Sequence, residues 1–160
     1  MKILVVYYSL EGNTKKAAEK IASELSADVM PLIPVKDIPK KGPLKFLVGG
    51  GGATKRKGTE LQPYSADASS YEAIIIGTPV WAGKPSMAMN QFLSDLKEKE
   101  KIIGAFAVSA GGDSSKCLAI LKNTAPSIRF TLDLADQRSK KFAPANEGKI
   151  AEFIASIAKA

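Results

Sequence analysis

Short apolar runs alternate with amphipathic helical patterns along most of the chain. The apolar runs predict five strands, at residues 3–8, 28–35, 71–77, 102–109 and 128–134. Apolar stripes at helical spacing predict helices between and after these strands, at residues 13–26, 86–96, 114–121 and 146–157. This alternation predicts an α/β fold, in which a five-stranded parallel sheet carries helices on both faces through right-handed crossovers.

The predicted strands differ in how deeply they should be buried. Residues 71–77 form the most β-branched run, which is typical of a central parallel strand covered on both faces. Pro31 and Pro34 interrupt residues 28–35, and proline lacks the N–H group that a sheet ladder needs. Apolar and polar residues alternate through residues 128–134. Residues 28–35 and 128–134 are therefore predicted to form the edge strands of the sheet.

Hydrogen-bond acceptors stand where three of the helices are predicted to begin. Ser86 is the expected cap of one helix, Asp113 or Ser114 that of the next, and Asn146 that of the last. Each of these side chains is short enough to accept a hydrogen bond from the first turn of the helix that follows it.

The segment at about residues 36–66 departs from this regular pattern. Its prolines and the run Gly49–Gly52 argue against one continuous helix, so a short helix near residues 44–48 and a mobile basic excursion are expected. Residues 36–57 contain seven basic side chains and one acid, Asp37. They form either a docking surface for an acidic partner or a solvated lysine-rich loop. The glycine run lacks the spacing of a nucleotide P-loop.

Composition limits the chemistry that the side chains can supply. The chain has 160 residues, which favours a single domain spanning residues 1–160, and carries a net charge of +7, which favours an anionic ligand or an acidic partner. It has no histidine and one cysteine, Cys117, which argues against Ser/His and Cys/His nucleophiles and against the usual zinc sites. No apolar run is long enough for a membrane span or a secretion signal, so a cytoplasmic protein is expected. Cys117 is expected to be a packing residue in a reducing compartment.

The loop after the first predicted strand has the features of an anion site. It reads Ser9-Leu10-Glu11-Gly12-Asn13-Thr14 and leads directly into a helix. Gly12 lets the backbone approach a ligand closely, while the polar side chains and the free N–H groups of the helix converge there. A phosphate is the anion expected at such a helix start.

Two further loops are predicted at the same edge of the sheet, because all three follow parallel strands. They read Thr78-Pro79-Val80-Trp81-Ala82-Gly83-Lys84 and Ser109-Ala110-Gly111-Gly112-Asp113. Together with residues 9–14, these loops resemble those of the flavodoxin family over nearly the whole chain. In that family the first loop has the pattern [ST]-x-x-G-x-[ST] and binds the FMN phosphate, the second often carries a tryptophan beside the isoalloxazine ring, and the third borders the other side of the ring.

The resemblance implies both a fold and a function. The fold is a flavodoxin-like three-layer sandwich with strand order 2-1-3-4-5. The function is that of an FMN-binding protein that carries single electrons between redox partner proteins, as a monomer or weak dimer. Trp81 would pack against the ring, and the Ala82–Gly83 peptide would be the one able to turn its carbonyl toward the flavin. All residues of the three loops, 9–14, 78–84 and 109–113, are the predicted cofactor-binding residues.

Departures from the family pattern keep other functions open. Family members that carry electrons are strongly acidic, whereas this chain is basic and would suit acidic partners. The third loop offers no aromatic side chain for the ring, so one ring face is either open or covered from elsewhere, for example by Tyr64. An open face and a basic surface favour the alternative of an FMN-dependent NAD(P)H or quinone oxidoreductase.

Other classes of protein are less consistent with the residues. A flavin-free module that binds nucleic acid or acidic proteins would use the basic segment, but that segment lacks the interleaved aromatics typical of nucleic-acid binding. A response-regulator domain needs acidic residues after the first and third strands, where the chain has Ser9 and Thr78. A low-molecular-weight phosphatase needs a cysteine and an arginine in the first loop, and neither is there.

Overall fold

The sheet has the predicted parallel order. The structure, a computed structural model, describes residues 1–54 and 57–160. Within them the parallel strands lie in the order β2-β1-β3-β5-β6. Their bounds are β1 (Ile3–Tyr7), β2 (Asp28–Pro31), β3 (Ala73–Trp81), β5 (Ile102–Val108) and β6 (Phe130–Leu134). A two-residue strand, β4 (Lys84–Pro85), pairs antiparallel with the end of β3 and was not predicted.

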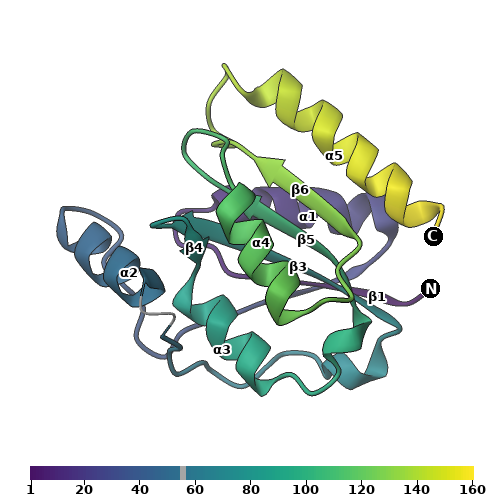
Figure 1. Cartoon of the computed structure of the whole chain (residues 1–160), viewed down its shortest axis with the longest axis horizontal. Helices are drawn as coiled ribbons and strands as arrows, with labels where there is room; N and C mark the ends of the chain where they lie inside the picture. Colours follow the sequence, from purple (N-terminus) through teal and green to yellow (C-terminus); the bar gives the residue numbers. More distant parts are fainter. Residues whose placement is uncertain (55–56) are drawn as a thin grey trace.

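Helices cover both faces of this sheet, as the alternating pattern predicts. The helices are α1 (Asn13–Leu25), α2 (Leu44–Thr54), α3 (Met87–Asp95), α4 (Ser115–Thr124) and α5 (Ala143–Ala158), with short 3₁₀ turns at Ala68–Ser70 and Lys99–Lys101. Helices α1 and α5 lie against one face and α3 and α4 against the other, whereas α2 lies at one end of the molecule beside β4 (Figure 1). No helix in the described part of the chain is long and apolar enough to cross a membrane.

The central strands β1 and β5 are apolar at every position because both faces of the sheet are buried there. In β1, Leu4 and Val6 join the apolar cluster beneath α3 and α4, whereas Val5 and Tyr7 join the cluster beneath α1 and α5. Alternate side chains of a strand point to opposite faces, so each face needs apolar residues of its own. The result is a three-layer sandwich with one core on each side of the sheet.

The edge strands lie where the sequence predicts them, but the first is shorter than expected. β2 ends at Pro31. The N–H of Leu32 still donates to the carbonyl of Tyr7 at 2.7 Å, but from Ile33 on the chain pairs with a later segment. Pro34 bridges Leu61, and the N–H of Val35 donates to the carbonyl of Glu60 at 2.9 Å. The basic segment therefore leaves and rejoins the body of the protein at this edge of the sheet.

The glycine run is helical, so the prediction that Gly49–Gly52 would end the helix was wrong. A Cβ at Gly49 would lie 2.9 Å from Cδ1 of Ile38 and 3.3 Å from the Trp81 ring, and one at Gly52 would lie 2.2 Å from Sδ of Met87. Glycine at these two positions allows the backbone of α2 to approach those side chains, so packing outweighs the poor helix propensity of glycine. Two residues of the expected basic excursion, Lys55 and Arg56, lie outside the described residues.

The predicted helix starts were partly correct. Ser86 caps α3, because its Oγ accepts a hydrogen bond from the N–H of Met89 at 3.2 Å. The prediction that Asn146 caps the last helix was wrong, because α5 begins three residues earlier, at Ala143. The buried amide of Asn146 instead accepts from the N–H of Ala135 at 3.1 Å and donates to the carbonyl of Ala135 at 3.2 Å. Asn146 therefore holds the loop after β6 against α5.

Candidate functional site

The loop after β1 leaves the start of a helix open. Gly12, at φ 99°, immediately precedes α1, and its N–H donates to Oγ of Ser9 at 3.0 Å. Among the described residues, no side chain caps the first turn of α1, and apart from the chain neighbours of Gly12 none of their atoms lies within 4 Å of the position that a Cβ on Gly12 would occupy. The first N–H groups of α1 therefore lack a side-chain acceptor, and the helix dipole adds partial positive charge there. This arrangement suits an anion such as a phosphate.

The polar side chains of this loop mostly hold the loop itself. The carboxamide oxygen of Asn13 accepts from the N–H of Gln137 at 2.9 Å, and Thr14 is only 1% exposed. Leu10 is buried in the core beneath the loop. The backbone N–H groups are consequently the main groups that the loop offers to a ligand.

The segment after β6 supports the first loop and was missed from the sequence. The ammonium of Lys16 donates to the carbonyl of Gln137 at 3.4 Å, and Arg138 lies 3.5 Å from the carboxylate of Glu11. Arg138 also binds both carboxylate oxygens of Asp136, at 3.1 Å each, and thereby lowers the pKa of Asp136 to about 2. The signal was present, because these residues follow a parallel strand just as the three predicted loops do.

The basic segment also reaches the first loop. Lys45, on α2, lies 2.6 Å from the carboxylate of Glu11. The phenol of Tyr8 donates to Oδ1 of Asp37 at 2.6 Å, and burial together with this carboxylate raises the pKa of Tyr8. The segment that seemed irregular in the sequence is therefore tied to the end of β1 at two points.

The second predicted loop is mainly a β-hairpin, so its assignment as a loop was wrong. β3 continues through Thr78, Pro79, Val80 and Trp81, and Trp81 then pairs with Lys84 across a two-residue turn. Ala82 and Gly83 have φ angles of 50° and 74°, as a type I′ turn requires at both central positions. The hairpin extends the central strand over the site and fixes the position of Trp81.

Trp81 lies at the junction of the hairpin, β1 and α2. Its ring is half-buried and packs edge-to-face against Tyr8, with ring centroids 5.6 Å apart and an interplanar angle of 85°. The backbone of Gly49 approaches the same indole ring from α2. The tryptophan is therefore an anchor for α2 as well as a side chain at the candidate site.

The third loop adjoins the other elements and closes on itself. Gly112, at φ 84°, donates its N–H to Oγ of Ser109 at 2.8 Å. The carboxylate of Asp113 accepts from the N–H of Ser115 at 3.2 Å and from its hydroxyl at 2.7 Å, and these bonds lower the pKa of Asp113. Gly111 next to them borders open space, and Ala110 is exposed.

Close approaches bring the three predicted loops together at the carboxyl edge of the sheet (Figure 1). A Cβ at Gly83 in the hairpin would lie 3.2 Å from Cδ of Lys116 on α4, and one at Gly112 would lie 3.2 Å from Cβ of Ala135. Tyr8, beside the first loop, packs on Trp81 of the hairpin. The predicted convergence of the loops is therefore present, with the segment after β6 as a fourth member.

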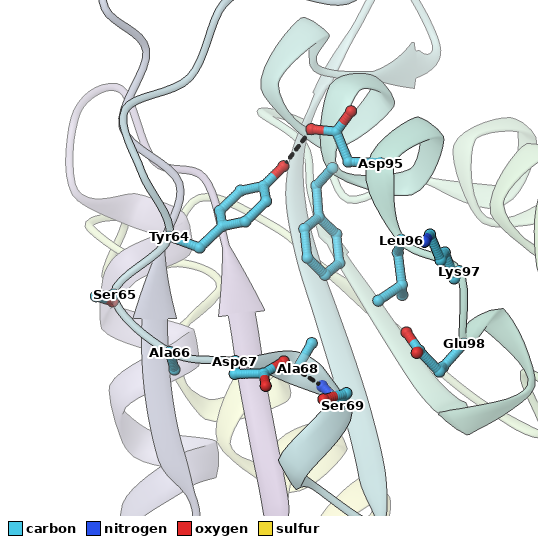
Figure 2. Close-up of a pocket in the computed structure, with 11 residues that line it drawn as sticks. Tyr64, Ser65, Ala66, Asp67, Ala68, Ser69, Asp95, Leu96, Lys97 and Glu98 are labelled. Atoms are coloured by element: carbon cyan, nitrogen blue, oxygen red, sulfur yellow. Dashed lines mark hydrogen bonds between the residues drawn. The ribbon is translucent and has the colours of Figure 1, made fainter.

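Two other residues singled out in the sequence lie away from the site. Tyr64, named as one candidate cover for the flavin, instead donates to Asp95 at 2.6 Å and packs on Phe92 beside the far end of α3, in a separate pocket of about 600 Å³ (Figure 2). Cys117 is fully buried in the core, and burial raises the pKa of its thiol to about 12, as suits a packing residue.

The fold and the loops define a flavodoxin-like protein, and comparisons with known proteins agree. A flavoprotein from Lactobacillus acidophilus, solved in complex with FMN, is similar with a TM-score of 0.67 and 25% identity, over 89% of this chain and 98% of that one. The oxidised flavodoxin 2 of Bacillus cereus matches with a TM-score of 0.62 and 16% identity, over 99% of each chain. A flavodoxin, WrbA-like protein from Agrobacterium tumefaciens matches with a TM-score of 0.59 and 20% identity, over 99% of this chain and 98% of that one.

A family model identifies the chain more closely. The family described as NADPH-dependent FMN reductase matches residues 1–149, and the chain belongs to this family. The predictions of a flavodoxin-like fold and of FMN as the cofactor are confirmed at the level of the family. The family description agrees better with the predicted alternative, a nicotinamide-dependent reductase, than with a pure electron carrier.

Proposed function

We propose that the protein is an FMN-dependent reductase that oxidises a nicotinamide nucleotide and reduces a small acceptor such as a quinone. The observation that carries the proposal is the uncapped start of α1 beside Gly12, in a chain that belongs to the NADPH-dependent FMN reductase family. Overall, NAD(P)H gives up a hydride and becomes NAD(P)⁺, while the acceptor takes up the two electrons and the proton of that hydride together with one further proton from solvent.

The residues present fit the phosphate of FMN. The free N–H groups at the start of α1 offer donors, and the open space beside Gly12 offers room for a phosphate group. Lys45 and Arg138 contribute positive charge nearby, although both are paired with Glu11. Bound FMN supplies the hydride and electron transfer, and the chain supplies binding, orientation and protection from water.

The other predicted loops support the ring in this proposal. The rigid I′ turn at Ala82 and Gly83 holds the hairpin, and Trp81 shields the ring from water on one side. Residues 109–113 border the opposite side, where Gly111 leaves room because it lacks a side chain. All the residues of loops 9–14, 78–84 and 109–113 remain the proposed cofactor-binding set.

The predicted electron carrier is the second candidate. It is supported by similarity to flavodoxins, but the sequence identities of 16% and 20% establish only a shared fold. In this candidate the basic segment docks acidic redox proteins, and the protein acts as a monomer or weak dimer. A reductase and a carrier differ in one measurable property, which is direct reaction with a nicotinamide nucleotide.

The test is anaerobic reduction of the FMN-loaded protein. NADPH is added without any other reductase, and the visible absorbance of the flavin is followed. Loss of the absorbance, followed by its return when a quinone is added, supports the reductase. An absorbance that NADPH leaves unchanged, but that dithionite bleaches, would contradict the reductase and favour the carrier.

A further inference from the structure

A hollow of about 660 Å³ lies beside the first loop, on the side of the sheet edge occupied by β2. One wall consists of Ser9–Gly12, and the other consists of Pro31–Pro34, where Ile33 is 48% exposed. No residue of the hairpin or of the third loop lines it, so it extends away from the proposed position of the flavin ring. Its volume is that of an ordinary small-molecule site.

Some of the charged side chains that line the hollow already have an ionic or hydrogen-bonding partner. Glu11 is neutralised by Lys45 and Arg138, and the carboxylate of Asp37 accepts hydrogen bonds from Tyr8 and from the N–H of Ile38. Of the lining cations, Arg138 is paired with Asp136, and Lys15 lies 3.7 Å from Glu19.

Lys40 and Lys41 differ from these cations. Within residues 1–54 and 57–160, neither lysine forms an ion pair, and both are exposed at the rim. The hollow thus combines an apolar wall with two lysines, neighbours in the sequence, that form no ion pair with the described residues.

We propose that this hollow binds the adenosine end of NADPH, with Lys40 and Lys41 on the 2′-phosphate. The inference rests on the proposed function, and it deepens that function by assigning the preference for NADPH over NADH to this chain's own residues. The apolar wall at Pro31–Pro34 suits the face of an adenine, and a phosphate monoester, with close to two negative charges at neutral pH, suits two neighbouring ammonium groups.

The start of α1 does not serve this second phosphate. In the proposed function its N–H groups are used by the FMN phosphate, so a second phosphate-bearing ligand needs cations of its own. Lys40 and Lys41 are the lining cations that meet this need without breaking an existing ion pair. Residues 9–12 line the hollow and also belong to the loop proposed to bind the FMN phosphate. NADPH and FMN would therefore lie next to each other.

The test is a binding measurement that does not depend on turnover. Adenosine 2′,5′-bisphosphate and adenosine 5′-monophosphate are titrated by calorimetry into the FMN-loaded protein at low salt. The wild type should bind the bisphosphate about tenfold more tightly than the monophosphate, and the double variant Lys40→Ala/Lys41→Ala should lose that preference. The matched control Lys57→Ala/Lys122→Ala removes the same charge outside the hollow and should retain the preference.

Kinetics then separate this inference from the proposed function. The Lys40→Ala/Lys41→Ala variant should raise KM for NADPH by about tenfold and leave kcat and the KM for NADH unchanged. Bleaching of the flavin by NADPH together with an unaltered preference in the double variant overturns the inference alone. Failure of NADPH to bleach the flavin, with the preference present and lost in the variant, overturns the reductase and retains the nucleotide site.

Discussion

The loops after β1 and β5 share one short pattern, yet they leave their helices in different states. In both loops a serine hydroxyl accepts from the N–H of a glycine three residues later, at 3.0 Å for Ser9 and Gly12 and at 2.8 Å for Ser109 and Gly112. Both glycines have positive φ, at 99° and 84°. The two turns are therefore close to equivalent in their backbone.

The difference lies in the residue after each glycine. Asp113 turns back on its own helix and accepts from the N–H of Ser115, whereas Asn13 turns away and accepts from the N–H of Gln137. The carboxylate of Asp113 thus supplies at the start of α4 the negative charge that a phosphate would supply at the start of α1. The turn geometry alone does not define a phosphate site; helix N–H groups that no carboxylate of the loop accepts from do.

The substitution with the largest expected effect is Asn13→Asp. It places an aspartate directly after the glycine of the first loop, as Asp113 follows Gly112 in the third. Aspartate keeps the oxygen that Gln137 binds but adds a negative charge beside the proposed phosphate. FMN affinity should fall by about 100-fold, because like charges a few ångström apart near a protein surface repel by a few kcal/mol. Fluorescence quenching of FMN on titration measures the affinity.

The reciprocal change, Asp113→Asn, is the control for Asn13→Asp. It removes the carboxylate from the start of α4 and should lower the free energy of unfolding only slightly. FMN affinity should change less than threefold, because Asp113 belongs to the third loop and the interaction between exposed charges weakens with distance from the proposed phosphate. Equal losses of affinity in the two variants would contradict the assignment of the phosphate to the first loop.

The second challenge compares Gly12→Ala with Gly112→Ala. Both variants place an L side chain at positive φ, so each should lose about 1–2 kcal/mol of unfolding free energy in chemical denaturation. The methyl group at position 12 enters open space where the phosphate is proposed, whereas the one at position 112 meets Cβ of Ala135 at 3.2 Å. FMN affinity should therefore fall about tenfold in the first variant and far less in the second. The reverse ranking would place the phosphate at the third loop.

Much of the fold could be predicted because the sheet is buried on both sides. Continuous apolar runs marked the central strands, and the interruption by Pro31 and the alternation in residues 128–134 marked the edges. The convergence of the loops followed from the parallel strands alone. The candidate phosphate loop could be proposed from the sequence because its glycine and its helix adjoin there.

The parts that sequence reasoning missed depend on contacts between distant residues. Glycines normally disfavour a helix, and only the positions of Ile38, Trp81 and Met87 explain why Gly49 and Gly52 lie in one. Asn146 had the right residue type for a cap, but its amide pairs with Ala135 of the preceding loop. In both cases tertiary packing overrides the local preference that the sequence displays.

The third challenge uses the position before the glycine, which is Glu11 in the first loop and Gly111 in the third. Glu11→Gln removes a negative charge near the proposed phosphate and frees Lys45 and Arg138 from their ion pairs with it. FMN affinity should rise about threefold, a small effect because these pairs are partly exposed. The matched change Gly111→Glu adds a side chain where Gly111 is proposed to leave room for the ring, so it should lower FMN affinity instead of raising it. A fall in affinity for Glu11→Gln would instead mean that its ion pairs shape the loop.

The smallest expected effect concerns the support of the first loop by the segment after β6. The pKa of Asp136 lies at about 2 because Arg138 binds its carboxylate, below the ordinary aspartate value of about 4. A lowered pKa means that the ion pair stabilises the fold fully above about pH 4 and that this contribution is lost as the pH falls toward 2. Because the pair is exposed, Asp136→Asn should lower the unfolding free energy by only about 0.5 kcal/mol at neutral pH, and the difference from wild type should vanish near pH 2.

Urea unfolding of both proteins across this range measures the difference. Asp67→Asn is the matched control, because that aspartate also has a lowered pKa but lies far from the loop. Weaker FMN binding at neutral pH in Asp136→Asn, and not in Asp67→Asn, would show that the ion pair between Asp136 and Arg138 holds the first loop in its binding conformation.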